Sequence, residues 1–238
     1  MKMIGAILWL SMMGISSCGE DDLHFKQGDL KISVETGVNW LHDFPLFLGI
    51  KIKNPPQFAV WVTDLDMNYI GTLYCTHKIA REGWIMNRGN RRQEALPFWA
   101  HCRGIQAKDG LFLPTKEEPL TDAVTGATPK NNYTLRFQPQ VPDRFLLFAE
   151  FNHSTDFNPT YPKQARAGES GYSGGKEGSG QPALVYRAEI DLEASVNEWE
   201  LQLIGHSSPD GSDGKLYRDM KGIDSALEIV KRVVVTRK

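Results

Sequence analysis

The feature that most constrains the fold is a succession of short segments with the two-residue hydrophobic period of β-strands. Helical periodicity is confined to two short stretches, residues 92–99 and 225–231, each long enough for only a turn or two of helix. The pattern therefore predicts an all-β fold, an antiparallel β-sandwich with Greek-key-like connections. The expected strands are residues 30–35, 58–62, 69–75, 133–137, 145–151, 184–190, 199–204 and 229–235.

Segment 145–151 is more continuously apolar than the others, which is typical of a central strand buried on both faces. Two stretches carry few strand signals, residues 83–120 and 152–181, and loops of that length in a compact domain are usually functional or disordered. The glycine-rich part of the second, residues 168–180, contains Gly-Gly-Lys. It lacks the Ser or Thr that follows the lysine of a phosphate-binding loop, which favours a flexible or ligand-covering loop.

The N-terminus has the organisation of an export signal. Lys2 precedes an apolar run over residues 3–15, too short to span a bilayer, and the run ends at Ile-Ser-Ser-Cys18. This ending resembles a bacterial lipobox, in which Cys18 becomes the lipidated first residue of the mature protein. We therefore predict a lipoprotein signal peptide at residues 1–17, an acidic tether at 18–28 and a single β-sandwich domain at 29–238. The predicted location is the cell envelope, lipid-anchored on the periplasmic side or at the cell surface.

Charge and hydropathy restrict the partners. The chain has 27 basic and 29 acidic residues, without the clustered Lys and Arg that phosphate backbones require, so we expect no nucleic-acid partner. No second apolar stretch approaches bilayer length, so the lipid on Cys18 is expected to be the only membrane anchor.

Two cysteines remain in the predicted mature domain, Cys75 and Cys102. In an oxidising compartment a disulfide between them is the simplest prediction. Two alternatives stay open. The thiols can be free and buried, or they can bind zinc together with His77 and His101, although neither half has zinc-finger spacing.

Residues 122–128, Asp-Ala-Val-Thr-Gly-Ala-Thr, resemble the flavinylation motif of bacterial envelope redox proteins. In those proteins a flavin transferase joins the phosphate of FMN to the hydroxyl of the last threonine. The resemblance implies Thr128 as the acceptor, with Asp122, Thr125, Gly126 and Ala127 as recognition residues. The same sequence followed by Pro129 is also a reasonable structural turn, which is the main alternative.

A wider resemblance covers most of residues 29–236. The order of segments 58–64, 96–102, 122–129, 150–158 and 180–186 is similar to the exported "domain of unknown function 2271" family. That family resembles immunoglobulin-like sandwiches and is associated with flavin-dependent envelope redox systems. It implies an immunoglobulin-like fold and envelope redox proteins as partners, and it carries no established enzyme activity.

Several other side chains are candidate ligand or flavin contacts. Trp84 and Trp99 fall in a predicted long loop, where an indole could stack on a flavin ring. Asn152, His153 and Asp156 follow the central strand, where a sandwich presents binding residues. A hydrogen-bonded turn is the alternative, and hydrolysis through Ser154 and His153 is a third, although no nucleophile elbow is present.

These patterns predict a redox carrier or a binding protein rather than a stand-alone enzyme. The first hypothesis is an envelope lipoprotein of a flavin-dependent redox system, carrying FMN covalently at Thr128. The alternative is a non-catalytic β-sandwich lipoprotein that binds a ligand or a protein through its long loops.

Overall fold

The computed structural model describes residues 29–45, 51–84, 91–121, 123–137 and 141–237. The predicted signal peptide, Cys18 and the acidic tether lie outside the described residues, and so does Asp122. Across the described ranges, no helix has both the length and the apolar character needed to cross a membrane.

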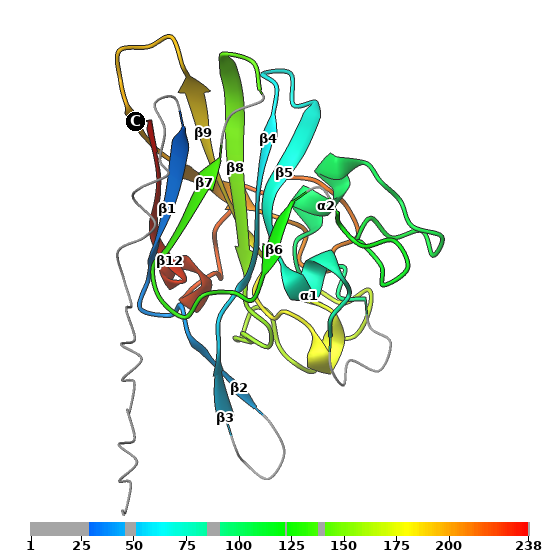
Figure 1. The fold of residues 1–238 in the computed structure, drawn as a ribbon. Helices are drawn as coiled ribbons and strands as arrows, with labels where there is room; N and C mark the ends of the chain where they lie inside the picture. Colours follow the sequence, from blue (N-terminus) through cyan, green and yellow to red (C-terminus); the bar gives the residue numbers. More distant parts are fainter. Residues whose placement is uncertain (1–28, 46–50, 85–90, 122, 138–140, 238) are drawn as a thin grey trace, which may run out of the picture.

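Two β-sheets pack face to face (Figure 1). The four-stranded sheet has the order β10-β12-β1-β7 and the six-stranded sheet has the order β11-β9-β8-β4-β5-β6. The strands of the first are β10 (Glu198–Glu200), β12 (Val230–Arg237), β1 (Leu30–Thr36) and β7 (Tyr133–Phe137). The strands of the second are β11 (Gln202–His206), β9 (Leu184–Asp191), β8 (Arg144–Asn152), β4 (Gln57–Thr63), β5 (Tyr69–Thr76) and β6 (Val124–Gly126). All pairings are antiparallel except that of β5 with β6. The predicted all-β sandwich is thus confirmed.

Short elements complete the domain. A separate hairpin pairs β2 (His42–Pro45) with β3 (Lys51–Asn54). The helices are α1 (His77–Ala80), α2 (Pro97–Arg103), and the 3-10 turns η2 (Gly175–Glu177) and η3 (Ser225–Glu228). Helix α2 begins with Pro97, which needs no intrahelical donor, and ends at Gly104 in the left-handed conformation. The helical stretch predicted at 92–99 therefore begins later, at the proline.

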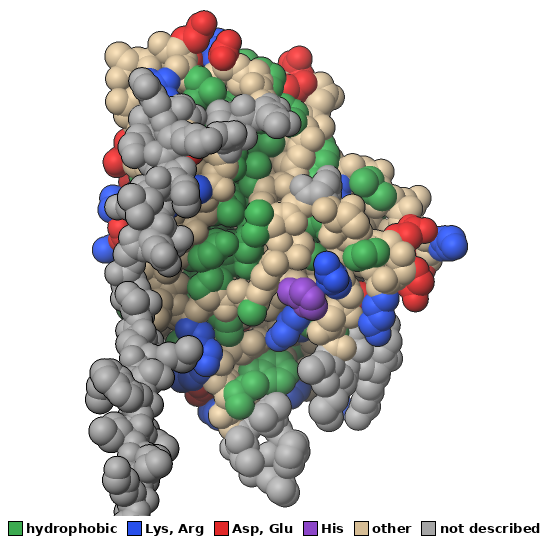
Figure 2. Space-filling view, in the orientation of Figure 1, with side chains coloured by type: hydrophobic (Ala, Val, Ile, Leu, Met, Phe, Trp, Pro, Cys, Tyr) green, Lys and Arg blue, Asp and Glu red, His purple; other side chains and the backbone are tan. Residues whose placement is uncertain are grey.

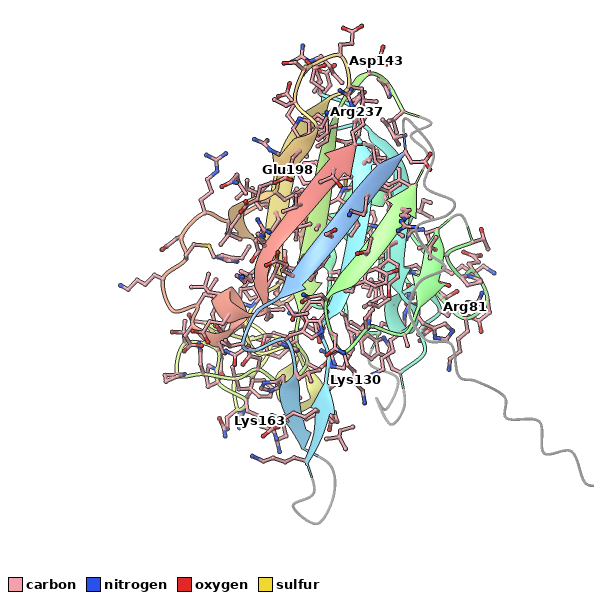
Figure 3. The ribbon with its side chains drawn as sticks, turned by 60° about the vertical axis from the view of Figure 1, so that its left-hand side comes forward. Arg81, Lys130, Asp143, Lys163, Glu198 and Arg237 are labelled. Atoms are coloured by element: carbon pink, nitrogen blue, oxygen red, sulfur yellow. The ribbon has the colours of Figure 1, made fainter. Side chains whose placement is uncertain are left out.

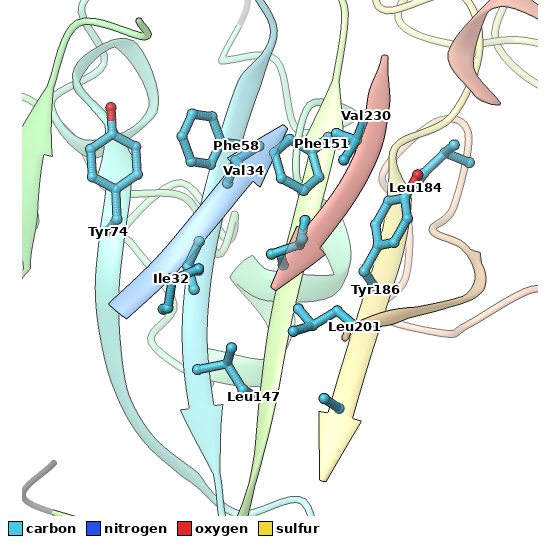
Figure 4. Close-up of a cluster of buried hydrophobic side chains, with 14 of the residues drawn as sticks. Ile32, Val34, Phe58, Tyr74, Leu147, Phe151, Leu184, Tyr186, Leu201 and Val230 are labelled. Atoms are coloured by element: carbon cyan, nitrogen blue, oxygen red, sulfur yellow. The ribbon is translucent and has the colours of Figure 1, made fainter. Parts of the chain in front are cut away.

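The main core fills the space between the two sheets (Figure 4). Ile32 and Val34 of β1 face Phe58 of β4 and Phe151 of β8, and all four side chains are buried. The rings of Phe58 and Phe151 stack with centroids 5.1 Å apart. The core explains the alternating pattern of β1, in which buried Leu30, Ile32 and Val34 are separated by half-buried residues, because successive side chains of a strand point to opposite faces of the sheet. Figure 3 shows the four-stranded sheet with its side chains.

The opposite face of the six-stranded sheet is covered by α1, α2 and the long loops (Figure 1). Trp61 of β4 and Phe148 of β8 stack there at 5.2 Å, with Phe98 of α2 against both rings. Strands β4 and β8 are therefore covered on both faces, which explains why 145–151 reads as a continuous apolar run. The prediction of a central buried strand at this position is confirmed by β8.

Three strand predictions differ from the structure. Segment 199–204 is two strands: β10 pairs with β12 in one sheet and β11 pairs with β9 in the other. The chain crosses between sheets at Leu201, which is buried and donates its backbone N–H to Val233. The hairpin β2–β3 and the edge strand β6 were not predicted, because their exposed or mixed side chains carry no regular two-residue period.

Candidate functional site

The segment predicted to carry FMN lies at an open edge of the six-stranded sheet. Strand β6 is the last strand of that sheet, and Thr125 pairs in parallel with Cys75 of β5. The chain leaves the sheet after Gly126, so that Ala127 is exposed and Thr128 is half-buried. Thr125 and Thr128 therefore differ in environment, because Thr125 is paired with β5 whereas Thr128 lies beyond the end of β6.

Two side chains from other elements hold the backbone of this segment, and the Thr128 hydroxyl makes a third contact. The phenol of Tyr74 donates to Gly126 O at 3.3 Å, and the indole of Trp40 donates to Pro129 O at 2.9 Å. The Thr128 hydroxyl donates to Pro56 O at 2.8 Å. The segment thus has a fixed conformation beside the sandwich rather than projecting away from it.

An aromatic layer lies directly under this segment. Tyr74 stacks on Phe58 at 4.7 Å and contacts Tyr133 of β7 at 5.3 Å. Burial raises the pKa of both tyrosines, so their hydroxyls stay protonated. Figure 2 shows hydrophobic side chains gathered in a band between β7 of one sheet and β5 of the other. Partly buried Leu73, Tyr133 and Phe137 of these strands pack against the core.

The surroundings of Thr128 can accommodate an attached flavin, but the hydrogen bond of its hydroxyl must first be broken. A half-buried hydroxyl beside an exposed alanine and an apolar seam suits a phosphate linkage with a ring resting nearby. Esterification would remove the hydroxyl proton, so the hydrogen bond from Thr128 to Pro56 would be lost. The segment must therefore move locally for the acceptor to be modified.

The two predicted loop tryptophans have different environments. Trp99 is fully buried in α2, where its indole donates to Thr72 Oγ1 at 2.9 Å and Arg103 lies over its ring. The prediction that Trp99 contacts a ligand is therefore wrong, because residue 99 belongs to a helix packed on the sheet. Trp84 is half-buried, and the guanidinium of Arg92 lies 4.7 Å from its ring centroid.

Asn152, His153 and Asp156, the candidate ligand or flavin contacts after the central strand, are all buried. Asn152 accepts from Ser179 Oγ at 2.7 Å and donates to Gln181 O at 3.2 Å. Asp156 accepts from Gln181 Nε2 at 3.0 Å and from Ser225 Oγ at 2.7 Å. These side chains fasten the 152–181 loop to the end of the sandwich, which corresponds to the alternative of a hydrogen-bonded turn.

The hydrolase alternative fails on geometry. His153 Nε2 lies 2.7 Å from Asn39 O, and its Nδ1 has no hydrogen-bond partner among the described residues. Ser154 instead accepts from Arg92 Nη1 at 2.8 Å. Burial also lowers the pKa of His153 to about 4. A nucleophile, a base and an orienting acid are therefore not aligned in one hydrogen-bonded chain.

The predicted disulfide is not formed, and both cysteines are free thiols. Cys75 is fully buried in β5, where its thiol donates to Thr76 O at 3.7 Å, whereas Cys102 is half-buried near the end of α2. Burial raises the pKa of both thiols. Within the described part of the chain, no group of three or more His, Cys, Asp or Glu side chains is placed to hold a metal ion.

Glu150 is the buried charge between β8 and α2. Its carboxylate accepts the backbone N–H groups of Phe98 at 3.3 Å and Trp99 at 2.8 Å, which are unsatisfied donors in the first turn of α2. Burial raises the pKa of Glu150 to about 7, although these donors oppose the shift. We assign it a structural role, as a cap supplied to the helix by the sheet.

A second polar group, which sequence reasoning did not single out, surrounds Arg92 and Glu94. Both side chains are buried, with Arg92 Nε 3.4 Å from Glu94 Oε1. Arg92 has a left-handed backbone, with φ of 55°, which is uncommon for a residue with a side chain. The available signal was a pair of charges two residues apart followed by an apolar stretch, which is too common in sequences to identify a site.

No protein-family model matches this chain, and neither the curated proteins nor the solved structures include a significant match to it. The resemblance to the "domain of unknown function 2271" family therefore stays a prediction.

Proposed function

We propose that this chain is an envelope lipoprotein of a flavin-dependent extracytosolic redox system, with FMN joined covalently to Thr128. Cys18 would supply the lipid anchor, and electrons would pass through the flavin to other envelope redox proteins. The observation that carries the proposal is the position of the motif, whose acceptor threonine follows an edge strand at a half-exposed site. The proposal also includes the immunoglobulin-like fold that the resemblance to the "domain of unknown function 2271" family implies.

The attachment is a phosphoryl-group transfer. The Thr128 oxygen would attack the FMN phosphorus of an activated donor such as FAD, the phosphoanhydride bond would break, and adenosine monophosphate would leave. The hydroxyl proton would pass to a base of the flavin transferase, since a threonine hydroxyl is a weak nucleophile by itself. No electrons are transferred in this step.

The chain itself would position the acceptor and exclude the neighbouring hydroxyl. Thr125 is held in the β5–β6 ladder opposite Cys75, whereas Thr128 is fixed by one side-chain hydrogen bond. Breaking a single bond of that kind costs on the order of 1 kcal/mol, so local opening at Thr128 is accessible. Opening at Thr125 would in addition disrupt strand pairing.

The test is peptide mass spectrometry after co-expression with a flavin transferase. We expect FMN on the wild-type peptide that contains Thr128, and none after Thr128→Ala. Thr134→Ala is the matched control, because Thr134 is an exposed threonine on β7 outside the motif and its loss should leave the modification intact.

Thr125→Ala separates recognition from attachment. It should lower the yield of flavin without abolishing it, because the acceptor remains. A Thr128 peptide that is unmodified in every preparation would overturn the proposal and favour the non-catalytic binding module.

A further inference from the structure

The two sheets of the sandwich differ in width, and the wider one extends past the other on the side of β6. The four-stranded sheet ends at β7, whose Tyr133 lies over Phe58 of β4 at 6.2 Å and Tyr74 of β5 at 5.3 Å. Strand β6 is one strand further out, and none of its described side chains belongs to the core between the sheets. The inner face of β6 and of the adjoining part of β5 is therefore left uncovered by the opposite sheet, and we call this surface the overhang.

The overhang is apolar and continuous with the core. Val124 is the pairing partner of Tyr74, so both side chains point toward the side of the four-stranded sheet. Tyr74 is buried there, whereas Val124 is 54% exposed. Leu73, Tyr133 and Phe137 are partly buried along the border between the overhang and the core. Apolar surface that continues from a core into solvent is typical of a binding site.

Two glycines leave space above the overhang. Gly71 pairs with Val62 of β4, and a Cβ at Gly71 would meet no described atom within 4 Å. A Cβ at Gly126 would meet only the Tyr74 hydroxyl, at 3.9 Å. Neither glycine has a positive φ, so neither is required by its backbone conformation. What the two glycines supply is room over the sheet.

The predicted FMN acceptor lies next to this space. Thr128 follows Gly126 by two residues, which span at most about 7 Å of extended chain. The ribityl phosphate of FMN can bridge that distance, so a ring joined to Thr128 can reach the surface formed by Gly126, Val124 and Tyr133.

We infer that the overhang seats the isoalloxazine ring of FMN attached to Thr128, in contact with Val124 and Tyr133. This inference rests on the proposed covalent attachment and adds the position of the ring. The ring would cover the exposed part of Val124 and lie edge to edge with the aromatic layer formed by Phe58, Tyr74 and Tyr133.

This position would leave one face of the flavin accessible to other proteins. The overhang covers the ring from one side, and β6 is the edge strand of its sheet. The opposite face of the ring would stay open to an envelope redox protein, without any opening of the sandwich.

The test is the fluorescence of the attached flavin on the full chain, after co-expression with a flavin transferase. A tyrosine in contact with an excited flavin quenches its emission by electron transfer. Trypsin digestion should release the flavin on residues 117–130, a segment without aromatic residues, and we expect emission to rise at least threefold. Equal emission before and after digestion would place the ring in solvent and overturn the inference.

Two variants assign the seat. Tyr133→Leu keeps an apolar side chain on β7 but removes the quencher, so emission of the intact protein should rise at least twofold. Gly71→Val fills the space above β5 at a position where a side chain meets no described atom, and it should displace the ring and raise emission similarly. Wild-type emission in both variants would overturn the inference.

Two control variants alter positions outside the overhang. Thr134→Val changes an exposed residue of β7, and Tyr217→Leu removes a tyrosine that pairs beside β11, at the opposite edge of the six-stranded sheet. Both should keep the wild-type emission. A rise in either control equal to that of Tyr133→Leu would count against the assigned seat.

Intact mass separates this inference from the proposal on which it rests. If the mass of FMN is present on Thr128 but emission is unquenched, attachment stands and the seat is wrong. If no preparation carries the mass of FMN, both are wrong.

Discussion

The two faces of the six-stranded sheet are built on different principles. The face toward the four-stranded sheet buries an apolar layer with aromatic and aliphatic side chains from both sheets. The face toward the loops also buries a large cluster, centred on Trp61 and Phe148, but it holds Glu150, Arg92 and Glu94 beside it. The same strands contribute to both faces, so the difference comes from what covers them.

A sheet that covers a sheet satisfies its own backbone groups through its ladders. Short helices and irregular loops do not, and their unsatisfied donors and acceptors need partners when they are buried. Glu150 supplies acceptors to the first turn of α2, and Asn152 and Asp156 fasten the loop after β8. The buried polar side chains on one face are thus a consequence of covering it with irregular chain.

Removing an aromatic ring from the apolar face should have the largest effect on stability. Phe58 is fully buried and stacks on both Tyr74 and Phe151. We expect Phe58→Ala to lower the free energy of unfolding by about 4 kcal/mol, because it leaves a cavity between the sheets. Urea unfolding measures the loss. Val124→Ala, at an exposed position, is the control and should change the free energy of unfolding by less than about 0.5 kcal/mol. Equal losses in the two variants would contradict a stabilising role for Phe58 in the core between the sheets.

Breaking the buried ion pair should have the next largest effect, on the other face. Arg92→Met leaves Glu94 without its cation and removes donors from Ser154 and Ser179. We expect a loss of about 3 kcal/mol, since an unpaired buried charge is costly. Adding Glu94→Gln to Arg92→Met should recover part of that loss. Strictly additive losses in urea unfolding of the single and double variants would show that the two charges do not interact.

The sequence predicts the face toward the four-stranded sheet better than the face toward the loops. The alternation in 30–35 and the continuous run in 145–151 identify β1 and β8, because burial between layers leaves a periodic signature. Glu150 is visible as a charge within an apolar strand. Arg92 gives no such signal, since its partners Ser154 and Ser179 are far along the chain. The helical stretch expected at 92–99 is too short to show which of its side chains face the sheet, so it does not predict that Trp99 of α2 is buried.

The smallest predicted effect concerns His153, which lies where the two regions meet, and it is a loss of stability in acid. Desolvation by burial lowers the pKa of His153 to about 4, and the nearby ring of His42 is 5.2 Å away. The folded state therefore keeps the imidazole neutral, with Nε2–H donating to Asn39 O. The unfolded chain binds the proton near pH 6.5.

Between about pH 6.5 and 4 the unfolded state thus binds more protons than the folded state, so the His153 contribution is complete above pH 6.5 and falls as the pH falls. Glu150, whose pKa is raised to about 7, acts in the opposite direction, because stability from a raised carboxyl pKa is lost as the pH rises. The two effects are separated by comparing wild type with His153→Gln, which retains a donor for Asn39 O and does not titrate. We expect wild type to lose about 2 kcal/mol relative to this variant between pH 6.5 and 4, measured by urea unfolding across that range. His77→Gln, at an exposed position, should follow the wild-type curve. Parallel curves for wild type and His153→Gln would mean that the buried imidazole is not held neutral.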